Sequence, residues 1–163
     1  MPPNEVKLLK LVWHPDDVDD ELNLVKPSLF RREELTGIAG SFVSVDRSDI
    51  AERACMERTA LNQAKKANGK TIFREFAKIG HLGCEAVRSS EDQGRMLFSV
   101  FSFPEDDNPA HCGIHSNLAV PLRGSAMDQL RNELVKLTSP PVGFDEAYGT
   151  ETEAEGAQHT SLK

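Results

Sequence analysis

The side chains best suited to chemistry lie in the segment 103–121, which reads FPEDDNPAHCGIHSNLAVP. His111, Cys112 and His115 stand close together there. An imidazole can move protons or bind a metal, and a thiolate can act as a nucleophile. Pro109 constrains the backbone just before them and Asn108 precedes it, so the segment predicts a turn that leads into a strand. The first hypothesis is a site centred on His111.

A second polar cluster ends another apolar stretch, 41–47 (SFVSVDR), and consists of Ser44, Asp46 and Arg47. If the fold brings this cluster to the turn at Asn108, the four polar groups Asp46, Arg47, Asn108 and His111 form a charged pocket for an anionic or peptide group. A purely structural interpretation stays open. In it the asparagine caps its own turn, the aspartate caps the next helix and the arginine pairs with a surface acid.

The alternation of residue types through 110–120 predicts a strand with two different faces. Ala110, Cys112 and Ile114 share one face, whereas His111, Gly113 and His115 share the other. Cys112 is then expected in the core rather than as a nucleophile. Four residues of strand span about 13 Å, so His111 and His115 are not expected to hold one zinc ion together.

A metal site stays as a secondary alternative, with His14, His111 and His115 as its ligands. His14 opens the acidic segment 14–21 (HPDDVDDE), where Asp16 is a further candidate ligand. That segment lacks the glycine and the final glutamate of a calcium-binding EF-hand loop, so an acidic surface loop is the favoured interpretation. The sequence predicts no cofactor, and its 3 cysteines show no CxxC spacing.

The elements that must position these residues follow from hydrophobic periodicity and from turn residues. The expected strands are 6–13, 41–47, 83–88, 95–103 and 110–120, and the expected helices are 48–68 and 125–137. For 6–13 a short helix stays open as the alternative. The polar link 89–94 predicts a hairpin between two of these strands. The segment 95–103 has apolar residues at both odd and even positions and is expected at the centre of the sheet. For 71–79 the pattern permits a strand but favours a short helix.

Together these elements predict one α+β domain over residues 1–141. We expect a mostly antiparallel sheet of four to five strands, with the two main helices on one face. Residues 142–163 are acidic and nearly free of large apolar groups, so they predict a disordered tail.

Composition limits the classes of partner. The net charge of −7 and the pI near 5.2 argue against binding to nucleic acid or to an anionic membrane. The sequence shows neither a signal peptide nor an apolar run long enough for a membrane span. Free cysteines in an acidic chain of this kind favour a reducing cytoplasmic location. Another protein is therefore the expected partner.

The pairing of Ser44–Arg47 (SVDR) with Asp107–His111 (DNPAH) resembles a pattern in a family of small uncharacterised bacterial proteins. The resemblance covers roughly residues 28–137. It implies an accessory protein of a multi-gene module, which acts as the partner of something larger, and it implies no particular reaction.

The alternative function is a small enzyme with a pocket around His111. A looser resemblance to ADP-ribosyltransferase-like folds gives catalytic roles to His14, to the serines of 41–44 and to Glu105. The sequence lacks an evident aromatic residue for stacking a nicotinamide. A serine hydrolase is less well supported, since the chain has no G-x-S-x-G motif.

Overall fold

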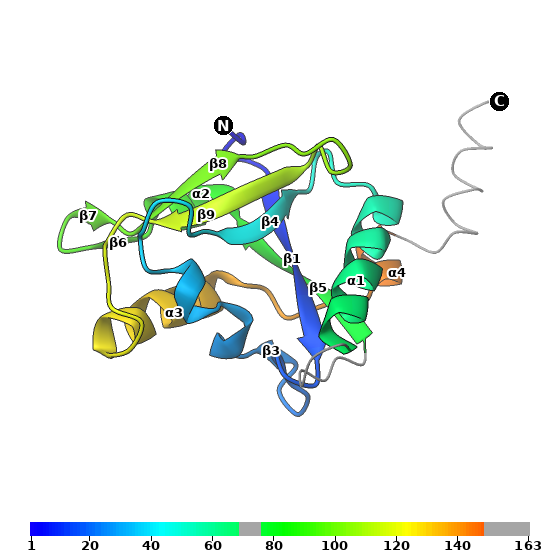
Figure 1. Ribbon diagram of the computed structural model, residues 1–163, viewed down its shortest axis with the longest axis horizontal. Coiled ribbons are helices and arrows are strands. Elements are labelled where there is room, and N and C mark those ends of the chain that lie inside the picture. Colours follow the sequence, from blue (N-terminus) through cyan, green and yellow to red (C-terminus); the bar gives the residue numbers. More distant parts are fainter. Residues whose placement is uncertain (69–75, 149–163) are drawn as a thin grey trace.

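A computed structural model of the chain describes residues 1–68 and 76–148. They form an α+β fold around a five-stranded sheet in the order β5-β1-β4-β9-β8, with every neighbouring pair antiparallel (Figure 1). The sheet consists of β1 (Lys7–His14), β4 (Val43–Arg47), β5 (Phe76–Gly83), β8 (Phe98–Ser102) and β9 (His111–Ser116). The predicted fold class is thus confirmed.

The remaining elements are helices and short hairpins. The helices are α1 (Arg53–Asn68), α2 (Cys84–Ser89), α3 (Ser125–Leu137) and α4 (Phe144–Tyr148), with 3-10 turns η1 (Pro27–Leu29) and η2 (Arg32–Glu34). The hairpins pair β2 (Val18–Asp19) with β3 (Leu24–Val25), and β6 (Glu91–Asp92) with β7 (Arg95–Met96). None of the helices in the described ranges has the length and apolar composition needed to cross a bilayer.

The main core lies on one face of the sheet, which we call the inner face. Leu8, Val45 and Ile114 bury their side chains there, and α3 covers them with Met127 and Leu130. Full burial of such a side chain stabilises the fold by about 1.5–3 kcal/mol. The amphipathic spacing predicted for 125–137 is therefore the reason that α3 docks where it does.

The opposite, outer face is covered over only part of its width. A smaller core joins Leu9 and Leu11 of β1 to Met56 of α1, and Phe144 and Tyr148 of α4 pack against it. The two main helices thus lie on opposite faces, and the expectation that they share one face is wrong. The outer face of β4, β9 and β8 lies beyond this smaller core.

Two predicted elements take a different form. Residues 84–89 are helical, not a strand, because Cys84 and Val87 stand three positions apart and both bury their side chains in the inner core. Residues 76–79 belong to β5, which pairs with β1 along its full length, so the helix favoured for 71–79 is wrong there. Residues 71–75 of that prediction lie outside the described residues.

The segment 95–103 lies at an edge of the sheet, although its composition predicted a central strand. Both faces of this strand carry apolar residues. Phe98 and Val100 enter the core, while Phe101 faces outward into a group of aromatic rings. The Arg88 side chain donates to the Val100 carbonyl at 3.2 Å and so occupies part of this edge. The hairpin in 89–94 exists, but it joins β6 to β7.

The C-terminal segment is ordered further than predicted. Val142 exchanges backbone hydrogen bonds with Ile79 of β5, and Phe144–Tyr148 is the helix α4. Disorder from Val142 onward is therefore wrong for 142–148, because Phe144 and Tyr148 supply the apolar contacts that hold the segment. Residues 149–163 lie outside the described residues, so for them the prediction is not tested.

Candidate binding site on the outer face of the sheet

The ladder between β4 and β9 places Asp46 directly opposite His111. The turn before β9 folds back so that Asn108 Nδ2 donates to Asp46 Oδ1 at 2.7 Å. Both Asp46 and Asn108 are buried, with 7% and 8% of their surface exposed. The two sequence clusters therefore meet through Asp46, Asn108 and His111, as expected.

The Asp46 carboxyl lies in a buried environment that disfavours its ionised form. Burial raises its pKa, because removing a carboxylate from water disfavours the charged form. The hydrogen bond from Asn108 and the charge of a protonated His111 act in the opposite direction but do not cancel the effect. Asn108 Oδ1 is itself enclosed and has no hydrogen-bond partner among the described residues. The buried end of the site is thus rich in acceptors.

The His111 ring is oriented by its backbone neighbour. His111 Nδ1 lies 3.0 Å from the Phe103 carbonyl oxygen. A carbonyl only accepts hydrogen bonds, so Nδ1 carries the proton, and in the neutral ring Nε2 keeps its lone pair. The Glu105 carboxylate lies 3.9 Å from the same nitrogen.

Three phenyl rings join His111 in one group of edge-to-face and tilted contacts, which we call the aromatic cluster: Phe42, Phe101, Phe103 and His111. Their ring centroids are 5.6 to 6.5 Å apart. A side chain at Gly113 would block this arrangement, since a Cβ there would lie 2.5 Å from Phe101 and 2.9 Å from Phe42. Glycine at this position therefore permits the rings to cross the strand.

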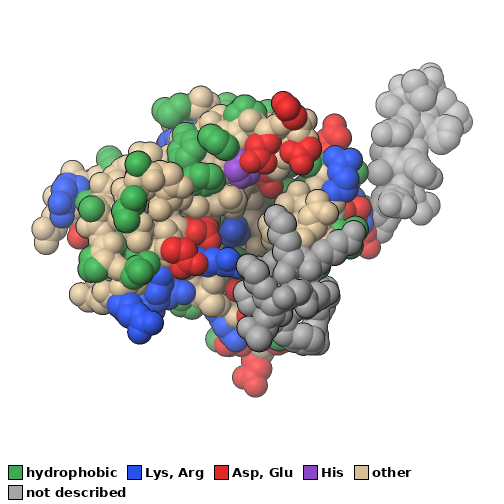
Figure 2. All heavy atoms as spheres, in the orientation of Figure 1, with side chains coloured by type: hydrophobic (Ala, Val, Ile, Leu, Met, Phe, Trp, Pro, Cys, Tyr) green, Lys and Arg blue, Asp and Glu red, His purple; other side chains and the backbone are tan. Residues whose placement is uncertain are grey.

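The turn between β8 and β9 adds charge to the aromatic cluster. Glu105, Asp106 and Asp107 are all exposed, and we call them the acidic turn. Figure 2 shows hydrophobic side chains gathered over β8 and β9, beside a group of Asp and Glu side chains. The Cys55 thiol contacts the Asp107 carbonyl at 3.5 Å, which joins the acidic turn to α1.

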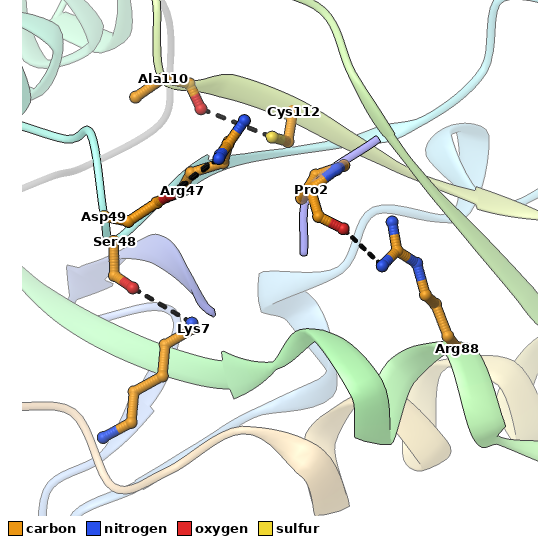
Figure 3. A network of polar contacts seen from close by, with 8 residues as sticks. All are labelled: Pro2, Lys7, Arg47, Ser48, Asp49, Arg88, Ala110 and Cys112. Atoms are coloured by element: carbon orange, nitrogen blue, oxygen red, sulfur yellow. Dashed lines mark hydrogen bonds and ion pairs between the residues drawn. The ribbon is translucent and has the colours of Figure 1, made fainter. Parts of the chain in front are cut away.

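The Arg47 side chain does not join Asp46, Asn108 and His111, and Ser44 lies opposite Gly113. Arg47 binds Asp49 through two hydrogen bonds, the shorter of 2.7 Å, and stands near Cys112 on the inner side of β4 (Figure 3). Ser44 is exposed, and its backbone carbonyl accepts a hydrogen bond from Lys10 Nζ at 3.2 Å. Successive residues of a strand point to opposite faces, so Asp46 and Arg47 separate.

Cys112 lies in the core, as its parity predicts. Burial raises the pKa of its thiol to about 11, and the charge of Arg47 only partly offsets this. A thiol with so high a pKa is almost entirely protonated at neutral pH and is a poor nucleophile.

The three histidines of the alternative metal site are not brought together. His14 contacts Asp20 at 3.0 Å, at the far end of β1. It stands five residues beyond Leu9, the partner of Asp46, which amounts to roughly 16 Å of strand. His115 is directed by its own hydrogen bond to the Ser41 carbonyl at 2.8 Å, and the rings that cross Gly113 lie between it and His111. Asp16, in the loop beyond His14, offers its backbone carbonyl to Ser28.

Sequence reasoning missed several residues of this site. The aromatic residues Phe42, Phe101 and Phe103 were not named among the candidate site residues, although their positions alternate with residues that enter the core. Tyr148 was placed in the tail, yet its hydroxyl is enclosed, without a hydrogen-bond partner among the described residues. Burial and the charge of Asp46 raise the Tyr148 pKa. The alternation of residues along 99–103 is the sequence feature from which outward-facing aromatic rings could have been predicted.

The fold and site define a class: an α+β protein with an antiparallel sheet whose outer face carries aromatic rings beside a buried aspartate. Comparison with protein-family models, with curated proteins and with solved structures finds no match for the chain. Function is therefore assigned from the geometry and chemistry of the site itself.

Proposed function

We propose that this chain is a protein-binding module that docks its partner on the aromatic cluster. The observation that carries the proposal is the exposure of Phe103, which keeps 49% of its surface accessible while its ring contacts Phe42 and Phe101. Phe42 and Phe101 are half-buried beside it, and apolar surface that stays accessible over neighbouring residues is typical of binding sites.

The composition of the site supports this assignment. Aromatic side chains are enriched at the centres of protein interfaces, and charged groups commonly form the rim. Here the aromatic cluster lies beside the acidic turn, whose Glu105 reaches the His111 ring. The resemblance of the SVDR and DNPAH segments to bacterial module proteins agrees with a role as a partner, since both segments contribute to this site.

A small enzyme is the second candidate function, favoured by the orientation of His111. The bond from Nδ1 to the Phe103 carbonyl leaves Nε2 as a potential general base, with the Asp46 carboxyl across the strand pair. The aspartate is bonded to Asn108, however, and no described contact joins its carboxylate to the imidazole. Asp46 therefore does not orient the imidazole, and binding is the better supported function.

Photo-crosslinking in the source cells tests the proposal. A benzophenone amino acid in place of Phe103 should form a discrete adduct with one partner. The purified partner should then bind the wild-type chain and lose at least about tenfold in affinity for Phe103→Ala, as expected for an aromatic anchor.

The matched control places the same crosslinker at Leu22, an exposed apolar residue of the β2–β3 turn region with 67% of its surface accessible. An adduct that forms equally well from Leu22, or a purified partner that binds Phe103→Ala as tightly as wild type, would contradict the proposal. A His111→Ala variant that keeps its fold and binds the partner normally while losing a reaction would favour the enzyme.

A further inference from the structure

We infer that the partner presents a basic side chain, an arginine in particular, which stacks on the aromatic cluster and pairs with the acidic turn. This inference rests on the proposed function and names the chemistry of the segment that docks there. It commits to a peptide segment of a partner protein as the occupant.

The first argument is the match between the rings and a planar cation. The face of an aromatic ring attracts a cation within about 6 Å, and the guanidinium group also stacks flat on such a ring. Phe103 is the exposed member of the aromatic cluster, in contact with Phe42 and with the His111 ring. A guanidinium stacked on Phe103 would therefore lie beside the neighbouring rings of the aromatic cluster as well.

The second argument is the supply of acceptors beside those rings. Glu105 has 49% of its side-chain surface exposed, and Asp106 and Asp107 are exposed next to it. A carboxylate can accept two parallel hydrogen bonds from one guanidinium, which fixes its orientation as well as its charge. Deeper in the site Asn108 Oδ1 is a further acceptor, enclosed and without a hydrogen-bond partner among the described residues.

Three cations in the described part of the chain are directed toward other groups. Arg47 binds Asp49, and Arg53 binds Glu57 and Asp145. Lys10 donates to the Ser44 carbonyl. The acidic turn therefore keeps its negative charge available. With a net charge of −7, the chain as a whole also attracts a basic segment and repels an acidic one.

The test titrates the isotope-labelled full chain with a short glycine–arginine peptide and follows backbone amide signals by NMR at low salt. A citrulline peptide of the same sequence is the matched probe, because citrulline has nearly the same shape without the charge. We expect the arginine peptide to shift amides of 103–111 in a saturable manner, and we expect the citrulline peptide to bind at least about threefold more weakly, the loss that removing a modest cation–π contact gives.

Two charge variants provide the second arm. Neutralising the acidic turn (Glu105→Gln, Asp106→Asn, Asp107→Asn) should lower the affinity for the arginine peptide several-fold. The control removes the same charge from exposed acids elsewhere (Glu5→Gln, Glu85→Gln, Glu91→Gln) and should change the affinity little. If both variants lose the same affinity for the arginine peptide, the net charge alone explains binding and the inference is overturned.

The remaining outcomes separate the inference from the proposed function. Equal binding of the citrulline peptide, or no saturable shift with either peptide, overturns the inference. If Phe103 still crosslinks to a discrete partner in that case, the protein-binding proposal stands and the partner segment is neutral or apolar. If the arginine peptide binds at 103–111 but no protein adduct forms, the cation site stands and the protein-binding proposal fails.

Discussion

At the scale of single residues, the Asp46–Asn108 hydrogen bond is the contact on which the site depends. It joins the end of β4 to the turn before β9, and it is enclosed by protein. Without the amide of Asn108, the buried carboxyl would lose its described donor. Asn108 is thus a structural support of the site, which agrees in part with the ordinary role of a turn asparagine.

We predict that Asn108→Ala lowers the free energy of unfolding by about 1–3 kcal/mol, because it leaves a buried acceptor unsatisfied. Urea unfolding followed by fluorescence measures this. Asp107→Ala removes an exposed neighbour in the same turn and should change stability by no more than about 0.5 kcal/mol. Equal effects of the two substitutions would show that the Asp46–Asn108 bond contributes nothing specific.

The raised pKa of Asp46 predicts a pH dependence with a definite sign. A carboxyl whose folded pKa lies above its unfolded value binds its proton more tightly in the folded state. Its stabilising contribution is therefore present at low pH and is lost as the pH rises from the unfolded value, near 3.8, through the folded pKa. The wild type should lose stability relative to Asp46→Asn over that interval, as urea unfolding of both proteins at successive pH values would show. A difference that stays constant or grows in favour of the wild type contradicts this prediction.

The cysteines predict an order of reactivity. Cys84 and Cys112 are buried, and burial raises the pKa of both thiols, whereas Cys55 is half-buried beside the acidic turn. Iodoacetamide should therefore modify Cys55 first in the folded protein, and mass spectrometry should find the other two modified only after unfolding. Early modification of Cys112 would contradict its place in the core. Cys112→Ala should then cost about 1 kcal/mol of stability.

At the scale of elements, strand parity decides which side chains meet. β4 and β9 send alternate residues to the two faces, so the outer face of this pair receives Asp46, His111 and Gly113. The rings of Phe42 and Phe101 then occupy the space above the glycine. The aromatic cluster is thus a property of three adjacent strands rather than of one segment.

We predict that Gly113→Ala destabilises the fold by about 1–3 kcal/mol, because its Cβ would displace two phenyl rings. Thermal or urea unfolding measures the loss, and partner binding should fall with it. Gly83→Ala is the control, since a Cβ there meets only the Ala86 side chain at 3.6 Å, an ordinary contact. A loss no larger than that of Gly83→Ala would show that the rings move aside freely.

At the scale of the whole molecule, the C-terminal segment completes the smaller core. Val142 bonds to β5, and Phe144 and Tyr148 pack against the residues that α1 and β1 contribute. Burial and the negative charge of Asp46 together raise the pKa of the Tyr148 hydroxyl. The ordered segment thus reaches from the edge of the sheet to the neighbourhood of the site.

Two truncations test the contribution of this segment. A chain that ends at Tyr148 should keep the stability of the full protein, because the residues beyond it are polar and acidic. A chain that ends at Pro141 loses the two aromatic contacts and should be less stable by about 1–3 kcal/mol. Circular dichroism during thermal unfolding compares them. Equal stability of the two truncated chains would show that α4 adds nothing to the fold.

The sequence alone determined the features that depend on local residue patterns. Alternation and periodicity predicted β1, β4, β9 and α3 and placed Cys112 in the core, since side-chain burial follows directly from the period of an element. The hypothesis that Asp46 lies close to His111 also came from the sequence. In an antiparallel sheet the end of one strand lies beside the start of its neighbour, as β4 and β9 do here.

Only the tertiary structure decided the rest, because the rest depends on neighbours that are distant in sequence. The partner strand β1 makes Phe76–Gly83 a strand, and the inner core makes Cys84–Ser89 a helix, because the residues of these short segments do not fix either conformation by themselves. β8 lies at the edge, with Phe101 half-buried and Phe103 exposed just beyond its end, although the same composition would also suit a central strand. Whether an aromatic residue is core or surface depends on what covers it, and that is a property of the assembled layers.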